Sequence, residues 1–299
     1  MNKLELQITA NEVRKGIVTA VHSAKAGHPG GSLSAADIFT YLYFEEMNID
    51  PKNPKKPDRD RFVLSKGHTA PGLYSALAQR GYFPVEDLKT LRHLGSYLQG
   101  HPDMKHIPGV DMSSGSLGQG ISAAVGMALS AKLSGESYRV YTLLGDGEIQ
   151  EGQVWEAAML AGHRKLDNLT VIVDNNGLQI DGNIEDVCSP YPIDKKFEAF
   201  NFHVINIDGN DFDQIDAAFK EAKATDAKSQ IKPSVFRISG YLAGENGQTI
   251  KLVCLGSEPS EPYDYNVEKL IKDKKFIDTL TIRINDKVVA TAPNGSIRS

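Results

Sequence analysis

Short, continuous apolar segments alternate with longer amphipathic segments along most of this chain, and this alternation limits its fold more than any other feature. The segments 139–144 (RVYTLL) and 169–174 (LTVIVD) have the length and composition of buried strands. Further strands are expected at 61–64, 202–207 and 234–238, and helices at 151–166 and 213–224. Strands that alternate with helices build a parallel sheet, so we predict an α/β fold, a doubly wound and mostly parallel sheet with helices on both faces.

The N-terminal part is expected to be largely helical. Residues 9–12 (TANE) have the pattern of a capping box, which would open a helix that ends at Gly27. Further helices are expected at 34–46, 72–81, 85–94 and 121–133. Residues 92–120 are rich in Gly, Ser, His and Pro, and a loop of this length inside a compact domain is usually functional.

The pattern changes after about residue 240. A strand is expected at 249–255 (TIKLVCL), a helix at 267–277, and a hairpin over 279–292 that turns at Asn285 and Asp286. We therefore divide the chain into a domain over residues 1–239 and an atypical, β-rich C-terminal segment over residues 240–299, whose role the sequence does not indicate.

The composition excludes several classes of protein. The 33 Lys and Arg residues against 38 Asp and Glu residues give a net charge of −5, which argues against a nucleic-acid partner. No segment approaches the roughly 18 apolar residues that a membrane span needs, so no membrane partner is expected. The two cysteines, Cys188 and Cys254, are too few for a disulfide framework or a zinc site, and a cytoplasmic location is expected.

Polar residues follow two neighbouring strands of the predicted sheet. The sequence Gly145-Asp146-Gly147 comes directly after the first strand, and Asn175-Asn176 comes directly after the second. Since ligands bind at the carboxyl ends of strands in such sheets, a carboxylate and an amide oxygen would lie side by side there. These are suitable ligands for a small cation that holds a diphosphate. Each half taken alone is also typical of a simple turn.

Three of the eight histidines lie in glycine-flanked loops: His28, His68 and His101. One such histidine would usually be an exposed loop residue, but three in the same kind of context suggest proton transfer or binding of hydroxyl groups. Their spacing is not that of zinc ligands. The Gly-rich segment 113–120 precedes an apolar helix, where it could cradle an anion or simply open the helix.

These residues resemble those of thiamine diphosphate enzymes, and of transketolase in particular. The diphosphate motif of that family corresponds to GDGEIQEG at 145–152 and NN at 175–176. The segments GHPGGSLSAAD, DRFVLSKGHTAPGLYSAL and GHPDMKHIPGVDMSSGSLGQGISAAVGMA are also similar, in the same order, from about residue 9 to residue 237. The resemblance implies thiamine diphosphate with Mg²⁺ or Ca²⁺ as cofactors, and transfer of a two-carbon ketol unit between sugar phosphates, as in the pentose phosphate pathway.

The resemblance implies a role for each matching position. Asp146, Asn176 and the carbonyl of Leu178 would hold the metal ion. Contacts with thiamine diphosphate would come from a larger set: His68, Gly115, Leu117, Asp146, Gly147, Asn176, Leu178 and Ile180. His28 and His101 would line the substrate channel and assist proton transfer, and Glu151 would join a carboxylate network at the subunit interface.

The resemblance covers about three quarters of the chain. The family's pyrimidine-binding domain and its activating Glu have no counterpart here, so the chain resembles the N-terminal subunit of a split transketolase that needs a C-terminal partner, as a homodimer or a heterotetramer. The family also has a further active-site His, whereas this chain has none after His203, and the last 60 residues resemble nothing in the family. The alternatives are another thiamine diphosphate enzyme, such as deoxyxylulose-phosphate synthase or a keto-acid dehydrogenase component, and a non-catalytic scaffold or regulatory subunit.

Overall fold

The computed structural model describes residues 1–179, 182–225, 234–239, 243–244, 248–254, 279–284 and 287–293, with side-chain surroundings given up to residue 224. Contacts divide the chain into two compact units, Met1–Ser239 and Gly240–Ser299. The first unit contains every described residue of the predicted site.

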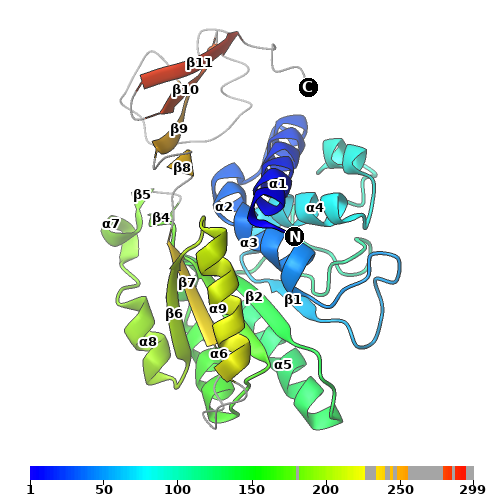
Figure 1. Ribbon diagram of the computed structural model, residues 1–299, viewed down its shortest axis with the longest axis vertical. Coiled ribbons are helices and arrows are strands. Elements are labelled where there is room, and N and C mark those ends of the chain that lie inside the picture. Colours follow the sequence, from blue (N-terminus) through cyan, green and yellow to red (C-terminus); the bar gives the residue numbers. More distant parts are fainter. Residues whose placement is uncertain are drawn as a thin grey trace. The chain divides into compact units, whose positions relative to one another are not determined.

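The first unit is built on a five-stranded sheet in which each neighbouring pair of strands is parallel (Figure 1). In spatial order the strands are β1 (Arg61–Leu64), β2 (Val140–Gly145), β3 (Leu169–Asp174), β7 (Ser234–Ser239) and β6 (His203–Asp208). The register places Gly145 opposite Asp174, so β2 and β3 end side by side. The predicted parallel α/β fold and the five predicted strands are confirmed.

Helices pack on both faces of this sheet. They are α1 (Lys3–Ala24), α2 (Pro29–Ser34), α3 (Ala36–Tyr41), α4 (Ala70–Arg80), α5 (Gln119–Ser134), α6 (Gly152–His163), α7 (Ile184–Cys188), α8 (Ile193–Ala199) and α9 (Phe212–Thr225). Shorter helical turns are η1 (Leu42–Glu46), η2 (Gly67–Thr69), η3 (Val85–Thr90) and η4 (Glu148–Gln150). A two-stranded ribbon joins β4 (Leu178–Gln179) to β5 (Gly182–Asn183).

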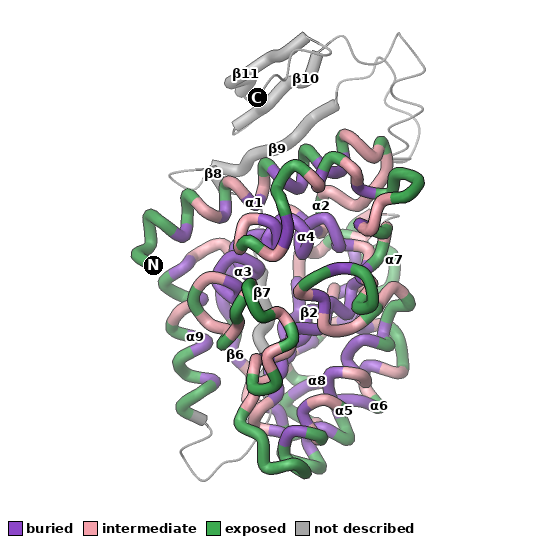
Figure 2. Tube along the Cα trace, turned by 90° about the vertical axis from the view of Figure 1, so that its right-hand side faces the viewer, coloured by how far each residue is buried: buried purple, intermediate pink, exposed green. Residues whose placement is uncertain are grey.

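The core forms two apolar clusters, one on each face of the sheet. Successive side chains of a strand point to opposite faces, and β2 shows this directly. Its Tyr141 and Leu143 join the cluster that includes residues of α1, α3, α4 and α9. Its Val140 and Leu144 join the cluster that includes residues of α5, α6 and α8. Buried and exposed positions accordingly alternate along α5 and α6 (Figure 2).

The first helix begins earlier than the sequence pattern predicted. The prediction of a capping box at residues 9–12 is wrong, because α1 already begins at Lys3 and its N-cap is Asn2. The Asn2 side chain accepts a hydrogen bond from the backbone N–H of Glu5 (2.9 Å), and the Glu5 carboxylate accepts one from the N–H of Asn2 (2.7 Å). The free N–H groups at the helix start are thereby satisfied, and the Thr9 hydroxyl instead donates back to the Glu5 carbonyl (2.8 Å).

Other elements differ in detail from the prediction. The helix expected at 34–46 is divided among the end of α2, α3 and the π-helical turn η1. The helix expected at 85–94 is the short 3-10 helix η3, in which only Leu88 is buried, so little apolar contact favours a longer helix. The elements α7, α8, β4 and β5 are not evident from the sequence pattern. Residues 91–118, all of them described, form no helix or strand, as expected for the long loop.

The second unit contains a four-stranded antiparallel sheet in the order β11-β10-β9-β8. Its strands are β8 (Ala243–Gly244), β9 (Gln248–Cys254), β10 (Thr279–Ile284) and β11 (Lys287–Pro293). β10 and β11 pair in the antiparallel manner expected of the predicted hairpin, while its turn at 285–286 and the helix expected at 267–277 lie outside the described residues. The described helices of the chain include none that is long and apolar enough to cross a membrane.

Replacing either of two helical glycines by alanine should have opposite effects on stability. A Cβ added at Gly162 in α6 would lie 1.9 Å from the carbonyl oxygen of Phe200, whereas one added at Gly126 in α5 would meet nothing within 4 Å. Gly162→Ala should therefore destabilise the purified chain by about 1–3 kcal/mol, because backbone must move. Gly126→Ala should stabilise it by roughly 0.5–1 kcal/mol, because Ala has less entropy to lose in a helix. Thermal melting followed by circular dichroism measures both, and equal effects would contradict the packing described for α6.

Candidate functional site

The predicted site residues gather where three adjacent strands end. Ser65, Lys66 and the turn η2 follow β1, Asp146 and Gly147 follow β2, and Asn175 and Asn176 follow β3. Because β1, β2 and β3 are neighbours and parallel, the three loops meet at one edge of the sheet (Figure 1). The sequence therefore places the two halves of the predicted motif on the same edge.

Asp146 is a buried carboxylate held by backbone groups. Its side chain accepts hydrogen bonds from the N–H of Gly147 (2.9 Å) and of Gly177 (2.7 Å), and its own N–H donates to the carbonyl of Asp174 (3.0 Å). These bonds join the loop after β2 to the loop after β3. Burial raises the pKa of Asp146 to about 6. Within residues 1–179 and 182–224 no ammonium or guanidinium group forms an ion pair with it, so its charge is suited to a bound cation.

The loop after β3 offers two amide oxygens. The Asn176 side-chain oxygen accepts a hydrogen bond from the N–H of Leu178 (3.0 Å), whose side chain is exposed. The Asn175 side-chain oxygen is buried and has no hydrogen-bond partner among the described residues. Those residues also contain no group of three or more His, Cys, Asp or Glu side chains that could hold a metal. One carboxylate, amide oxygens and a carbonyl are a donor set that fits Mg²⁺ or Ca²⁺.

A buried ion pair lies beside these ligands. The Lys66 ammonium contacts the Asp174 carboxylate at 2.5 Å, and both side chains are only 2% exposed. Lys66 also donates to the carbonyl of Gly31 (3.1 Å), and the Ser34 hydroxyl donates to Asp174 (2.8 Å). The pair connects the ends of β1 and β3, which lie on either side of β2. Neither residue was assigned a role from the sequence, although Lys66 stands two positions before His68 in a segment that carries the family resemblance.

Glu148 is a second buried acid whose role is not evident from the sequence. Its carboxylate accepts hydrogen bonds from the Ser65 hydroxyl (2.5 Å) and from the N–H groups of Gly118 (2.9 Å) and Gly145 (3.1 Å). Burial raises the pKa of Glu148. The N–H of Ile121 donates to Ser65 as well (3.2 Å), so two amides at the start of α5 are already bound within the protein. This favours a helix-opening role for the Gly-rich segment over an anion cradle at those amides.

The three loop histidines lie close together. The rings of His28 and His68 are 5.0 Å apart between centroids and meet edge to face. His28 and His68 are half-buried, so they are not the exposed loop residues that a single such histidine would suggest, whereas His101 is exposed. Burial is the main cause that lowers the pKa of all three, to about 3 for His68, and their charged forms would also repel one another. All three are therefore neutral at physiological pH.

Close backbone contacts hold the histidine loops in place. A Cβ added at Gly67 would lie 2.8 Å from the backbone nitrogen of Gly115, and one added at Gly115 would lie 3.2 Å from the His101 ring. The Tyr74 hydroxyl donates to the carbonyl of His101 (2.8 Å). Gly115 therefore lies between the loops of His68 and His101, and only a residue without a side chain fits at Gly67.

The remaining predicted residues are placed as follows. The Glu151 side chain packs against Gly118, where an added Cβ would lie 2.8 Å from the Glu151 Cβ. Leu117 is 37% exposed and contributes apolar surface to the loop before α5. Ile180 lies outside the described residues. The structure thus brings the metal-ligand candidates together at the strand ends and the histidines together beside Gly115, with Lys66 near both groups.

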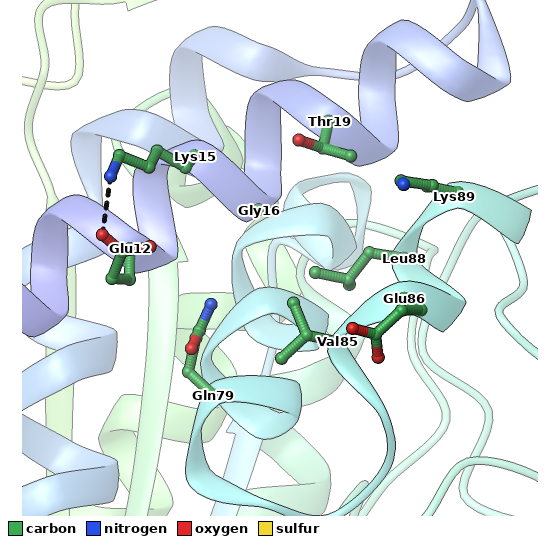
Figure 3. A pocket seen from close by; sticks show the side chains of 9 residues that line it. All are labelled: Glu12, Lys15, Gly16, Thr19, Gln79, Val85, Glu86, Leu88 and Lys89. Carbon is green, nitrogen blue, oxygen red and sulfur yellow. Dashed lines mark hydrogen bonds and ion pairs between the residues drawn. The ribbon is translucent and has the colours of Figure 1, made fainter. Parts of the chain in front are cut away.

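A separate pocket lies between α1, α4 and η3 (Figure 3). Its lining comprises Glu12, Lys15, Gly16, Thr19, Gln79, Val85, Glu86, Leu88 and Lys89. It contains none of the predicted site residues, and two of its charged side chains, Glu12 and Lys15, form an ion pair (2.7 Å). We therefore assign the function to the strand ends and not to this pocket.

Comparison with known proteins identifies the family. Residues 6–249 match the transketolase, thiamine diphosphate binding domain. The chain belongs to the transketolase family. The match extends beyond residue 237 and into the segment after residue 240, so the expectation that nothing in the last 60 residues resembles the family is wrong for residues 240–249. The motif resemblance missed this part because it contains no chemically distinctive residues.

Some relatives are matched over most of their length, and others are matched over about a third of it. The 6-deoxy-6-sulfo-D-fructose transketolase subunit of Clostridium sp. (strain MSTE9) is 47% identical over 237 residues, which cover 79% of this chain and 85% of that protein. An apulose-4-phosphate transketolase subunit of Phocaeicola vulgatus is 42% identical over 228 residues, which cover 76% and 80%. Human transketolase is 44% identical over 222 residues, which cover 73% of this chain but 35% of the human protein.

A solved structure agrees with the fold. The transketolase from Campylobacter jejuni superposes with a TM-score of 0.74 at 38% identity, covering 80% of this chain and 38% of that one. The predicted family and fold are confirmed, and the matched domain is the one that binds thiamine diphosphate. The relatives that match over most of their own length are named as transketolase subunits, in agreement with the expectation of a transketolase-type enzyme subunit.

The buried ion pair predicts a strong coupling between Lys66 and Asp174. Lys66→Met should destabilise the chain by about 3–5 kcal/mol, because it leaves the buried Asp174 carboxylate without its cation. Lys66→Met combined with Asp174→Asn should cost less than the sum of the two single changes, by about 1–3 kcal/mol. Urea unfolding of the four proteins measures this coupling. Additive costs would show that the two side chains do not depend on each other.

The burial of His68 should make the folded chain less stable at acidic pH. The pKa of His68 is about 3 in the folded chain, against roughly 6.5 when unfolded, so between these values the unfolded state binds a proton that the folded state does not. The free energy of unfolding should therefore fall as the pH falls below about 6.5, by about 2 kcal/mol at pH 5 from this group. His68→Gln should remove this part of the pH dependence. Replacing the exposed His163 by Gln is the control, and an unchanged acid slope in His68→Gln would contradict the burial of this ring.

Proposed function

We propose that this chain is the N-terminal subunit of a two-subunit transketolase. It would transfer a two-carbon ketol unit from a ketose phosphate to an aldose phosphate, together with a C-terminal partner that carries the pyrimidine-binding domain and the activating Glu. The main support is the meeting of Asp146, the Asn175–Asn176 loop and three neutral histidines at one edge of the sheet, in a chain of this family. Two relatives of similar extent that are named as subunits support the need for a partner.

The cofactor half of the site would be formed by the strand-end residues. Asp146, Asn176 and the carbonyl of Leu178 would hold Mg²⁺ or Ca²⁺, which neutralises a diphosphate. Gly147 would let the diphosphate approach the backbone, and His68 would contact it from the opposite side as a neutral imidazole. Thiamine diphosphate, when bound, supplies the electron sink for carbon–carbon bond cleavage. Gly115, Leu117 and Ile180 would lie along its rings, and Glu151 would face the subunit interface.

The chain's own proton chemistry would fall to His28 and His101. Both pKa values are lowered by burial, so the rings are neutral at physiological pH and can accept a proton from a sugar hydroxyl group or return one. The Nδ1 atom of His28 is buried and has no hydrogen-bond partner among the described residues, so it is available to a bound ligand. Retention of both histidines and of Asp146 argues against a purely structural subunit.

The finer assembly and location are part of the same proposal. The complex would be a homodimer or a heterotetramer in which the cofactor lies between subunits. Cys188 is an exposed free thiol, which is compatible with a reducing cytoplasm. Neither nucleic acid nor a membrane is proposed as a partner.

The decisive test is cofactor binding and turnover with the cognate C-terminal subunit. The chain with its partner should transfer a ketol unit, and the chain alone should show weak or no thiamine diphosphate binding and no transfer. Full transketolase activity of the purified chain alone would refute the two-subunit proposal.

Asp146→Ala tests the metal ligand. In the reconstituted enzyme this change should abolish Mg²⁺-dependent binding of thiamine diphosphate in calorimetry, because the only carboxylate of the proposed ligand set is lost. The change also leaves the N–H groups of Gly147 and Gly177 without their acceptor, so thermal melting first establishes that the variant is folded. Asp58→Ala, in an exposed loop, is the control and should bind as the native enzyme does. Native affinity in Asp146→Ala would overturn the assignment.

A further inference from the structure

Two glutamines join the loops that follow β2 and β3. The Gln150 side chain, in η4, donates a hydrogen bond to the Gln179 side chain in β4 (2.9 Å) and accepts one from it (3.2 Å). Gln150 also donates to the carbonyl of Cys188 at the end of α7 (2.7 Å). A carboxamide has two N–H donors and one oxygen, so every polar group of the Gln150 side chain has a partner. The sequence pattern indicates no role for either glutamine.

The contacts on both sides of Leu178 fix its place beside Asp146. One residue before it, the N–H of Gly177 donates to the Asp146 carboxylate (2.7 Å). One residue after it, the Gln179 side chain is held by Gln150. The Leu178 side chain is 58% exposed, so its burial contributes little to holding it in place. The position of the Leu178 carbonyl, a proposed metal ligand, therefore depends on the two anchors that flank it.

The glutamine pair is also tied to the residue that follows Asp146. A Cβ added at Gly147 would lie 3.3 Å from the Cδ atom and 3.4 Å from the Cγ atom of Gln179, so this side chain packs along the Gly147 backbone. The N–H of Gln150 donates to the carbonyl of Gly147 (3.3 Å) within the turn of η4. Both glutamines are half-buried. The Asp146 carboxylate and the Leu178 carbonyl are therefore joined by a short, closed set of contacts.

We propose that Gln150 and Gln179 are positioning residues that hold the Leu178 carbonyl at the spacing from Asp146 that Mg²⁺ requires. The proposal rests on the function proposed above and specifies how this chain adapts its site to Mg²⁺. This ion demands near-ideal octahedral geometry, whereas Ca²⁺ accepts about six to eight oxygens in a flexible arrangement. Both oxygens of the Asp146 carboxylate already accept amide hydrogens, so the site offers few protein lone pairs, as is typical of Mg²⁺ bound with phosphates. Hydrogen bonds behind metal ligands, such as those of the glutamine pair, orient the ligands.

The test compares two cations in the enzyme reconstituted with the C-terminal subunit. Methionine at either position keeps the length of the side chain but removes the amide hydrogen bonds. Gln150→Met and Gln179→Met should each raise the Mg²⁺ concentration needed for half-maximal binding of thiamine diphosphate, measured by calorimetry, by about 10-fold or more, a loss typical of changes behind metal ligands. With Ca²⁺ the value should change by less than about threefold, because a flexible shell absorbs a small shift of one ligand. The double variant should bind no worse than Gln150→Met, since both changes break the same contact.

Gln153→Met is the matched control. Gln153 is also half-buried, and its side chain donates a hydrogen bond to Ser122 (2.7 Å). This bond joins α6 to α5 and not to the loop after β3. The control should therefore need the same concentrations of Mg²⁺ and Ca²⁺ as the native enzyme.

Cofactor binding is measured without turnover and separates the possible failures. A native complex that binds thiamine diphosphate with neither cation would refute the transketolase function and this proposal with it. Native binding with an unchanged Mg²⁺ requirement in both variants would refute the role of the glutamines alone. An equal loss for Mg²⁺ and Ca²⁺ would also refute that role, because the pair would then support the loop in general. Thermal melting of each variant comes first; Gln179→Met retains the bond from Gln150 to Cys188, and failure of both variants to fold would overturn the proposal.

Discussion

The ion pair between Lys66 and Asp174 is the interaction on which the arrangement of the site depends. It joins the end of β1 to the end of β3 across the intervening β2, with both side chains almost completely buried. Removing two charges from water is costly, so this contact is favourable only because Ser34 and the carbonyl of Gly31 complete the hydrogen bonds of the pair. The same interaction therefore fixes the starting points of the loops that carry His68 and Asn176, and it draws the loop of Gly31 toward them.

The balance of charge around this pair explains the chemistry of the neighbouring residues. Three buried acids, Asp146, Glu148 and Asp174, lie near one buried ammonium, and that ammonium is committed to Asp174. Burial raises the pKa of both Glu148 and Asp146, but Glu148 accepts hydrogen bonds from a hydroxyl and two amides, whereas Asp146 accepts them from two amides alone. A carboxylate that is undercompensated at the sheet edge is suited to a cation, and burial, which raises its pKa, lowers the pKa values of the three histidines.

The sequence predicted the fold and part of the site for identifiable reasons. Continuous apolar strands such as LTVIVD and the glycine and histidine motifs are local signals, so the parallel sheet, the strand-end Asp146 and the three histidines could be found without a structure. Lys66 and Glu148 were missed because a charged residue in a sequence is normally read as exposed, and only the folded chain shows what pairs with it. The start of α1 was misplaced because two equally good capping boxes lie seven residues apart, and only the burial of Leu6 and Ala10 favours the earlier one.

The contact between Gly67 and Gly115 has a consequence for how this chain can diverge. The backbone of one loop fills the space that a side chain of the other would need, so residue 67 is constrained by its neighbour's main chain and not by any chemistry of its own. A descendant that adopts a new sugar is free to exchange side chains that face the substrate. It has no such freedom at residue 67, where even a methyl group would push apart the loops that carry His68 and Gly115.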